Sequence, residues 1–308
     1  MEFSHYSVML EECIEGLAVK PDGIYIDGTC GGAGHSSAIA RLLSGSGMLY
    51  GIDRDPTAVK TATERLAGLN AKVLKGCFSD MKALTAAEGV SKADGILLDL
   101  GVSSHQLDTL ERGFSYHGSA PLDMRMSQEG VSARDIVNTA SCEELSRILF
   151  EYGEEKFSRR IADTIIKRRE ISPIETTDEL ADIVCSSIPA KFRREKNPCK
   201  KTFQALRIAV NCEFDELDRA LDDGFEMLKP GGRMCIITFH SLEDRMVKQR
   251  FASFCKGCIC PPDFPVCVCG KEPRGRLVNR KPIEASEKEL AENNRSHSAK
   301  LRIIEKIM

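Results

Sequence analysis

Residues 24–55 constrain the fold of this chain more than any other stretch. They predict a short apolar strand, a turn with four glycines, a helix that begins near His35, and a second strand at 48–52 that ends on Asp53. Glycines allow a tight turn and let backbone N–H groups approach an anion at the start of the helix. An acid at the tip of the second strand is placed to accept both hydroxyls of a ribose. The stretch therefore predicts a βαβ unit that binds an adenosine-type cofactor.

The details of this turn narrow the choice of cofactor. A dinucleotide-binding turn has a third glycine where the helix meets the strand, but Ser37 occupies that place here. A nucleotide-triphosphate loop is excluded because no Gly-Lys-Ser/Thr sequence follows. Asp27, directly before the glycines, suits the ammonium group of an amino-acid moiety. These features favour S-adenosylmethionine, and an ordinary βα turn without a ligand is the alternative.

Two further strands are predicted downstream of the βαβ unit. The first covers residues 71–74, and the loop after it places Phe78 against an adenine or, as an alternative of equal weight, in the core. The second, at 94–100, is apolar enough to be buried on both faces, so Asp99 within it is anomalous. We expect Asp99 at the mouth of the ligand site, with residues 101–106 lining the place where cofactor meets substrate. A plain turn at the strand end is the alternative.

From about Asp108 the alternation of strands and helices stops. Residues 112–126 predict a polar loop that is ordered by a ligand or by adjoining helices. Four helical patterns follow, at 132–139, 142–151, 154–170 and 176–187, with Ser141, Thr176 and Thr177 as candidate N-caps. We therefore predict an all-helical insertion at residues 109–200, which recognises the substrate, between two parts of one α/β domain at 1–108 and 201–308.

The second part of the α/β domain begins near Thr202. Residues 202–228 predict one long amphipathic helix, which a Lys-Pro-Gly-Gly sequence ends, and residues 233–239 predict the fifth strand, followed by His240. Residues 271–281 predict a basic loop, and residues 299–307 predict a closing strand.

Composition and charge bound the partners. The 308 residues include no apolar run as long as a membrane span, and the N-terminus lacks the features of a signal peptide. Thirteen cysteines, an odd number, suit a reducing compartment, so we expect a cytoplasmic protein with no membrane partner. The whole chain has a net charge of −3, but residues 156–201 carry 12 Lys and Arg against 7 Asp and Glu. This excess favours nucleic acid, with a solvated helix face as the alternative. The basic residues of the predicted helices are Lys156, Arg159, Arg160, Lys167, Arg168 and Arg169.

A cysteine cluster lies near the C-terminus. Cys258 and Cys260 form one Cys-x-Cys pair, and Cys267 and Cys269 form another. Four thiolates can close a tetrahedral zinc site, but this spacing is less diagnostic than Cys-x-x-Cys, and reduced, unligated thiols are the alternative. A zinc ion here would be structural, because four cysteines leave no open position. We assign no metal to the catalytic site.

Several sequence blocks together resemble the bacterial RsmH (MraW) family, almost from end to end. They are GGAGHS at 31–36, IDRD at 52–55, DGILLDLGVSS at 94–104, RGFS at 112–115, PLDMRM at 121–126, TFQALRIAVN at 202–211, ITFHSLEDR at 237–245 and NRSHSAKLR at 294–302. The resemblance implies a Rossmann-like class I S-adenosylmethionine-dependent methyltransferase domain with an inserted helical domain. It also implies methylation of N4 of a cytidine in the decoding region of 16S ribosomal RNA, so the expected partner is that RNA or the small ribosomal subunit. A homodimer is left open. The cofactor contacts that the resemblance implies are Ala33, Gly34, His35, Asp53, Phe78, Asp99 and Gln106.

Methylation of cytosine N4 makes definite demands on the catalytic residues. The N4 lone pair is delocalised into the ring, and acceptors aimed at the N–H groups favour attack as positive charge develops on nitrogen. Asp99, Ser103 and Ser104 are the candidate acceptors. His240, at a strand tip, could orient the base or accept the released proton, and the alternative is that it only caps the following helix.

Other activities have weaker support in the sequence. A carbon-5 cytosine methyltransferase needs a cysteine nucleophile, and Cys199 after Pro198 offers one only within a basic linker. The Asp/Ser-Pro-Pro-Tyr/Phe motif of DNA amino-methylation is absent at residues 99–102. A catalytically idle RNA-binding assembly factor, or a methyltransferase that acts on DNA or protein, remains the alternative.

Overall fold

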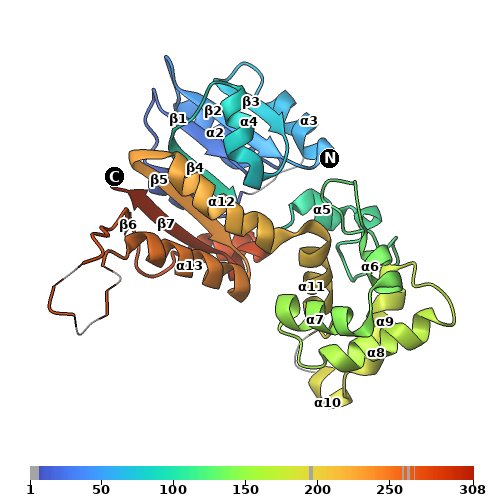
Figure 1. Ribbon diagram of the computed structural model, residues 1–308. Coiled ribbons are helices and arrows are strands. Elements are labelled where there is room, and N and C mark those ends of the chain that lie inside the picture. The colour runs from blue at the N-terminus through green and yellow to red at the C-terminus, as the bar shows by residue number, and fades with distance from the viewer. Residues whose placement is uncertain (1–6, 194–196, 259, 262–263, 267) are drawn as a thin grey trace. The chain divides into compact units, whose positions relative to one another are not determined.

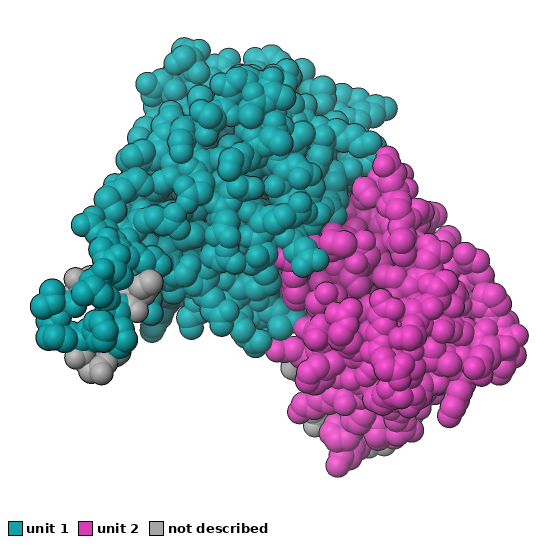
Figure 2. All heavy atoms as spheres, viewed as in Figure 1, with its two compact units in different colours: residues 1–101, 215–308 teal, residues 102–214 magenta. Residues whose placement is uncertain are grey.

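The computed structural model describes residues 7–193, 197–258, 260–261, 264–266 and 268–308. It contains two compact units, which Figure 2 shows in two colours. The sheet unit comprises the chain up to Gly101 together with Asp215–Met308, and the helical unit comprises Val102–Phe214. The sequence-based boundaries at 108/109 and 200/201 thus differ from the structural ones, because the segment after Gly101 and the helix after Pro198 both belong to the helical unit.

The sheet unit contains one seven-stranded sheet with the order β3-β2-β1-β4-β5-β7-β6. Its strands are β1 (Ile24–Asp27), β2 (Met48–Asp53), β3 (Ala71–Lys75), β4 (Ala93–Asp99), β5 (Leu228–Thr238), β6 (Gly275–Leu277) and β7 (Lys300–Lys306). The first five are parallel, and β7 runs antiparallel to β5 and β6. The chain leaves β1 toward β2 and β3 and returns on its other side at β4. Ligands of such sheets bind at this switch point, beyond the carboxyl ends of β1 and β4.

Helices cover both faces of the sheet (Figure 1). They are α1 (Leu10–Leu17), α2 (Gly34–Leu42), α3 (Pro56–Arg65), α4 (Met81–Ala87), α12 (Glu213–Met227), α13 (Ser241–Cys255) and α14 (Glu287–Glu292). One buried cluster joins α4, α12 and α13 to the side chains of Ile96 and Leu98, and another joins α1 and α2 to Leu97. Because successive strand residues point to opposite faces, β4 is buried on both sides, as its continuous apolar sequence predicts.

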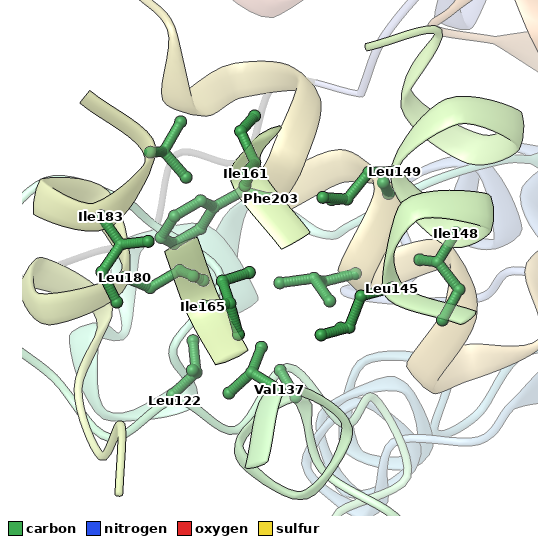
Figure 3. Packing of buried hydrophobic residues seen from close by; sticks show 14 of the residues in the cluster. Leu122, Val137, Leu145, Ile148, Leu149, Ile161, Ile165, Leu180, Ile183 and Phe203 are labelled. Atoms are coloured by element: carbon green, nitrogen blue, oxygen red, sulfur yellow. The ribbon is translucent and has the colours of Figure 1, made fainter. Parts of the chain in front are cut away.

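The helical unit has its own core. It contains α5 (Ser104–Asp108), α6 (Ala133–Thr139), α7 (Cys142–Gly153), α8 (Ser158–Arg169), α9 (Thr177–Ser187), α10 (Ala190–Arg193) and α11 (Cys199–Asn211). Leu145, Ile161, Leu180 and Phe203, one from each of four helices, meet in the apolar cluster of Figure 3. The unit therefore buries apolar side chains of its own, as a domain does.

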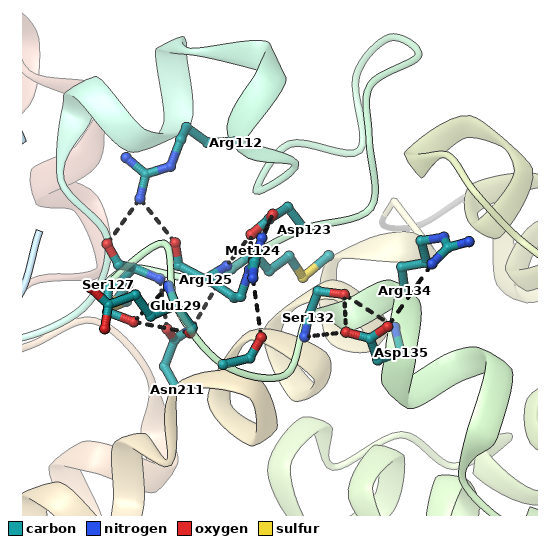
Figure 4. Close-up of polar contacts among 12 residues, drawn as sticks. Arg112, Asp123, Met124, Arg125, Ser127, Glu129, Ser132, Arg134, Asp135 and Asn211 are labelled. Atoms are coloured by element: carbon teal, nitrogen blue, oxygen red, sulfur yellow. Dashed lines mark hydrogen bonds and ion pairs between the residues drawn. The ribbon is translucent and has the colours of Figure 1, made fainter.

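Helix α11 also orders the polar loop at residues 112–126 (Figure 4). The Asn211 side chain accepts a hydrogen bond from the Met126 N–H (2.8 Å) and donates one to the Met124 carbonyl (2.8 Å). The Arg112 guanidinium donates to the carbonyls of Arg125 (2.9 Å) and Met126 (3.0 Å). The sequence predicts that a ligand or the adjoining helices order this loop, and in the structure an adjoining helix does so.

Three predicted elements differ from the observed ones. The predicted helix at 202–228 is two helices, because Cys212 between α11 and α12 has a left-handed backbone (φ 51°). Part of the predicted basic loop at 271–281 is strand β6, which pairs with β7. The fifth strand begins at Leu228, so it includes the Lys-Pro-Gly-Gly sequence that was predicted to precede it.

Among the described residues, no helix is both long and apolar enough to cross a membrane. The sequence also predicts a helix that begins at His5 and Tyr6 and runs to about Leu17, and its predicted start lies outside the described residues.

Candidate active site

The carboxyl edge of the sheet carries an acid at the end of each strand around the switch point. Asp27 ends β1, Asp53 ends β2 and Asp99 ends β4. Parallel strands present their carboxyl ends on one edge, so strands far apart in sequence bring these side chains to the same side of the sheet unit.

The glycine turn leads into α2 without a side-chain cap. Ala33, the N-cap residue, has a left-handed backbone (φ 61°) and no side-chain hydrogen bond to the first turn. The first N–H groups of a helix need acceptors from elsewhere, and a ligand carboxylate is one such acceptor. A Cβ at Gly34 would overlap the Ser7 hydroxyl, and a Cβ at Gly28 would lie 2.5 Å from Leu98. A larger residue at either position would therefore have to displace a neighbouring side chain.

Asp53 is held by two backbone groups. Its Oδ2 accepts from the Gly31 N–H (2.7 Å) and its Oδ1 accepts from the Asp55 N–H (2.9 Å). Burial raises the pKa of Asp53 to about 6, although these two hydrogen bonds oppose the shift. The carboxylate is thus fixed beside the glycine turn, and each oxygen keeps a lone pair that can accept a ribose hydroxyl.

Asp99 has the same place on β4 but an incomplete set of partners. Its backbone N–H donates to the Thr29 hydroxyl (2.6 Å), and its Oδ2 lies 3.8 Å from Nδ1 of His35. Its Oδ1 is buried and has no hydrogen-bond partner in the described part of the chain. Burial raises the pKa of Asp99 to about 6; His35 opposes this shift and Asp27 adds to it. A buried acceptor without a donor is costly, so this oxygen is suited to a ligand that brings an N–H group.

Asp27 and His35 are both occupied by protein contacts. Asp27 is 1% exposed and accepts from the Ser36 hydroxyl (2.5 Å) and the Thr29 N–H (3.1 Å). Burial raises its pKa as well, against the effects of His35 and of both hydrogen bonds. Nε2 of His35 lies 2.9 Å from the Val8 carbonyl, so this nitrogen carries a proton and Nδ1 faces Asp99.

The loop after β3 holds Phe78 beside the end of β1. A Cβ at Gly28 would lie 2.9 Å from the Phe78 Cβ, and the ring is partly buried against the α12 side of the core. Glu216 on α12 fastens this loop, because it accepts from the Cys77 thiol (2.8 Å) and from the Ser79 hydroxyl. The Phe78 ring contacts the core, as one of the two alternatives predicts, and its contact with an adenine stays a prediction.

His240 is the N-cap of α13. Its Nδ1 accepts from the Glu243 N–H (3.4 Å), and its Nε2 lies 3.0 Å from Oε1 of the same residue. The Glu243 carboxylate is 2% exposed and in turn accepts from the N–H groups of Phe239 (3.0 Å) and His240 (3.3 Å). The capping role considered for His240 is therefore present, and both ring nitrogens face Glu243.

Three predicted site residues belong to the helical unit. Ser103 is the N-cap of α5, and its hydroxyl accepts from the Gln106 N–H (3.2 Å). The side-chain amide oxygen of Gln106 accepts from the Ser103 N–H (3.0 Å), which completes a capping box. Ser104 is the first residue of the helix. These contacts order the segment that follows Asp99 in the chain.

Cys199, the candidate nucleophile for carbon-5 chemistry, is 4% exposed at the start of α11. Its Sγ lies 3.9 Å from that of Cys185, and burial first, then this neighbour, raise its pKa above the usual range. A buried thiol that stays protonated is a poor nucleophile, so the structure speaks against carbon-5 chemistry at Cys199.

Comparison with known proteins decides the family. The model of the MraW methylase family matches residues 2–307 of the chain. The chain belongs to this family. It is 55% identical over 313 residues to the ribosomal RNA small subunit methyltransferase H of Acetivibrio thermocellus, with 100% of both chains covered. It is 54% identical over 311 residues to the ribosomal RNA small subunit methyltransferase H 2 of Agathobacter rectalis, with 99% of both covered.

Family membership confirms several predictions. The resemblance to the MraW family is correct, and so is the α/β methyltransferase fold, whose parallel sheet and helical unit are both observed. The chain is a methyltransferase of a family that uses S-adenosylmethionine, which confirms the predicted cofactor. Three features of the site fit a bound methyl donor and the group that accepts the methyl. They are the Asp99 oxygen without a hydrogen-bond donor, the uncapped start of α2 and the closely packed glycine turn.

Sequence reasoning missed several residues that build this site. Thr29 positions the backbone of Asp99, Glu216 fastens the Phe78 loop, and Glu243 faces both nitrogens of His240. Only the last had a signal in the sequence, because a capping residue followed three positions later by Glu is a capping-box pattern. Thr29 and Glu216 are apparent only when the strands and α12 are brought together.

Proposed function

We propose that this chain transfers a methyl group from S-adenosylmethionine to the exocyclic N4 of a cytidine in the decoding region of 16S ribosomal RNA. The observation that carries the proposal is the buried Asp99 oxygen at the end of β4, which has no donor among the described residues. The two relatives with 55% and 54% identity are named ribosomal RNA small subunit methyltransferases, which supports the small subunit or its RNA as the partner.

The carboxyl edge of the sheet offers a complementary group for each part of the methyl donor. Asp53 would accept the ribose hydroxyls, Phe78 would contact the adenine, and the first N–H groups of α2 would bind the carboxylate. Buried acids at three strand ends favour the positive charge of the donor. S-adenosylmethionine supplies an electrophilic methyl group on a sulfonium. The proposed contacts are Ala33, Gly34, His35, Asp53, Phe78, Asp99 and Gln106.

Asp99 then acts on the acceptor amine. Its Oδ1 accepts one N–H of the cytosine N4, which favours the pyramidal nitrogen whose lone pair attacks the methyl carbon. As positive charge develops on nitrogen, the carboxylate stabilises it and takes up the released proton. Ser103 and Ser104 are the proposed additional acceptors, and His240 orients the base. In-line attack forms no covalent intermediate with the protein, so most of the rate enhancement comes from positioning.

The helical unit is the proposed site of RNA recognition. Three of the six basic residues predicted for this role form contacts within the protein; Arg169, for example, donates to the carbonyls of Val137 (2.9 Å) and Ala140 (2.8 Å). Three others are exposed and form no ion pair within the described residues: Lys156, Arg160 and Lys167. Their guanidinium and ammonium groups are available for phosphates, whose contacts supply most of the affinity for RNA.

The proposal is tested by methyl transfer to small ribosomal subunits and to 16S RNA, followed by nucleoside analysis. We expect N4-methylcytidine from the wild type and almost none from Asp99→Ala. Another methylated nucleoside would overturn the assignment to N4. RNA binding without any transfer would identify an assembly factor, and methylation of DNA or protein alone would move the activity to another substrate class.

A further inference from the structure

The segment between α13 and β6, Lys256–Arg274, contains a group of thiols outside the active site. Its 19 residues (256 to 274) form no helix or strand where they are described. Segments longer than about 12–15 residues without secondary structure are uncommon in compact domains. The Sγ atoms of Cys258, Cys260 and Cys269 lie within 4.8 Å of one another. Two cysteines of the first arm of the segment, which follows α13, thus lie close to one cysteine of the second arm, which leads into β6.

No described residue of this segment belongs to an apolar core cluster. Phe264, Val266 and Val268 are 51%, 70% and 75% exposed. The base is closed by the Arg274 N–H, which donates to the Phe254 carbonyl (2.9 Å). Beyond that base, the cysteine cluster joins the two arms. Small folds that lack a core commonly use a metal for this purpose.

Two backbone N–H groups donate hydrogen bonds to these sulfur atoms. The Cys260 N–H donates to Sγ of Cys258 (3.4 Å), and the Val268 N–H donates to Sγ of Cys260 (3.4 Å). Hydrogen bonds to ligand atoms of this kind orient them in metal sites.

The distance between two of the sulfur atoms matches that in a tetrahedral zinc site. Zn–S bonds of about 2.3 Å at tetrahedral angles place two sulfur atoms about 3.8 Å apart. The Sγ atoms of Cys258 and Cys269 are 3.7 Å apart, which is far longer than the roughly 2.05 Å of a disulfide.

We propose that Cys258, Cys260 and Cys269 bind one Zn²⁺ ion that joins the two arms of this segment. The sequence alone leaves zinc and unligated thiols as alternatives, and the geometry favours zinc. Each thiol gives its proton to solvent as its Zn–S bond forms, and no electron is transferred. Cys267, which belongs to the second Cys-x-Cys pair, lies outside the described residues, and the fourth ligand is not assigned. The ion is structural, and it holds a segment that carries the exposed cations Lys256 and Lys271.

The test measures metal content and leaves methyl transfer aside, so it is independent of the proposed function. The full chain is purified with reductant from zinc-supplemented cells, and we expect about one zinc per chain by mass spectrometry of the elements. Cobalt added to the metal-free chain should give thiolate-to-cobalt charge transfer and the intense visible bands of a tetrahedral site. Cys260→Ser and Cys269→Ser should each lower bound zinc by about 10-fold or more under chelator competition. Cys212→Ser, which alters an exposed cysteine of the helical unit, is the matched control and should retain the metal.

A second measurement uses only the wild type and so does not depend on how the variants fold. Removal of zinc by a chelator should accelerate tryptic cleavage at Lys256 and Lys271 by roughly 10-fold, because the segment then opens locally. The proposal is overturned if the zinc-replete, reduced chain contains no zinc, if the variants retain it, or if the mass shows a Cys258–Cys269 disulfide in the presence of reductant.

Discussion

The tips of β2 and β4 carry the same residue type in two different states. Asp53 and Asp99 each end a parallel strand at the carboxyl edge, and burial raises the pKa of both to about 6. Backbone N–H groups bond both oxygens of Asp53, whereas Oδ1 of Asp99 has no partner among the described residues. Position and acidity are therefore alike, and hydrogen bonding separates the two.

This difference indicates two roles. A carboxylate that the backbone holds on both oxygens is rigid, which suits the binding of a fixed group such as a ribose. A buried oxygen without a donor costs about 1–3 kcal/mol, and a substrate that brings an N–H group removes this cost as it binds. We infer that the tip of β2 binds the cofactor and that the tip of β4 acts on the amine. The predictions below separate these roles.

The largest expected effect is at Asp99. Asp99→Ala should lower kcat at saturating S-adenosylmethionine by about 10³-fold, because the acceptor for the amine proton is lost. Transfer of a labelled methyl group to small subunits measures this rate, and Asp53→Asn is the matched control at the other strand tip. A similar loss of kcat in both variants would show that the two tips do not divide binding from chemistry.

Asp53→Asn should act on cofactor binding. Charge-assisted hydrogen bonds contribute about 1.5–3 kcal/mol, so the Kd for S-adenosylmethionine should rise roughly 10- to 150-fold. Titration calorimetry measures this constant, and kcat at saturating cofactor should change little. An unchanged Kd would remove Asp53 from the ribose site, whatever the effect on turnover.

The raised pKa of Asp99 should appear in the pH dependence of stability. The pKa of this carboxyl is about 6 in the folded chain and 3.8 in the reference for the unfolded chain. Its contribution to stability is therefore full below about pH 4 and is lost as the pH rises through 6. Asp99→Asn avoids this loss, so its advantage in unfolding free energy over the wild type should grow by roughly 2–3 kcal/mol between pH 4 and 7. Urea unfolding at several pH values measures the difference.

The same experiment sharpens the comparison when it is done on Asp53→Asn. Asparagine has one carbonyl oxygen, so it cannot accept from both Gly31 and Asp55 as Asp53 does. This variant should therefore gain less stability at neutral pH than Asp99→Asn. Equal gains would mean that the two hydrogen bonds do not distinguish the two carboxylates.

The sequence predicts much of this fold because its local signals agree with its tertiary structure. The capping residues Ser141 and Thr176 do begin α7 and α9, and the apolar sequence of β4 is buried on both faces. The break at Cys212 has no such signal, since neither glycine nor proline marks it and the apolar periodicity continues across it. Strand β6 was missed because three residues form a strand only by pairing with β7.

The positions of the site residues could be predicted, but their contacts could not. Strand lengths place Asp53 and Asp99 at the carboxyl edge, because each follows an apolar run. Which oxygen lacks a donor depends on the Thr29 hydroxyl and on the 3.8 Å separation from His35. Those distances follow from the packing of β1, β4 and α2, which no single segment encodes.

A third strand tip gives the smallest expected effect. His240 follows β5, and its cap on α13 should contribute about 1 kcal/mol to stability. His240→Ala should therefore lower the unfolding free energy by about that amount. His240→Asn, which keeps a capping side chain, should retain most of it. Ser141→Ala, which removes the cap of α7, is the matched control for a loss of stability without a catalytic part.

Because both ring nitrogens of His240 face Glu243, proton uptake by His240 would require its cap to break. We therefore expect His240→Asn, which keeps the cap but loses the orientation of the base, to lower kcat by no more than about 10-fold, whereas a loss of 10²-fold or more at full stability would move the proton acceptor from the tip of β4 to the tip of β5.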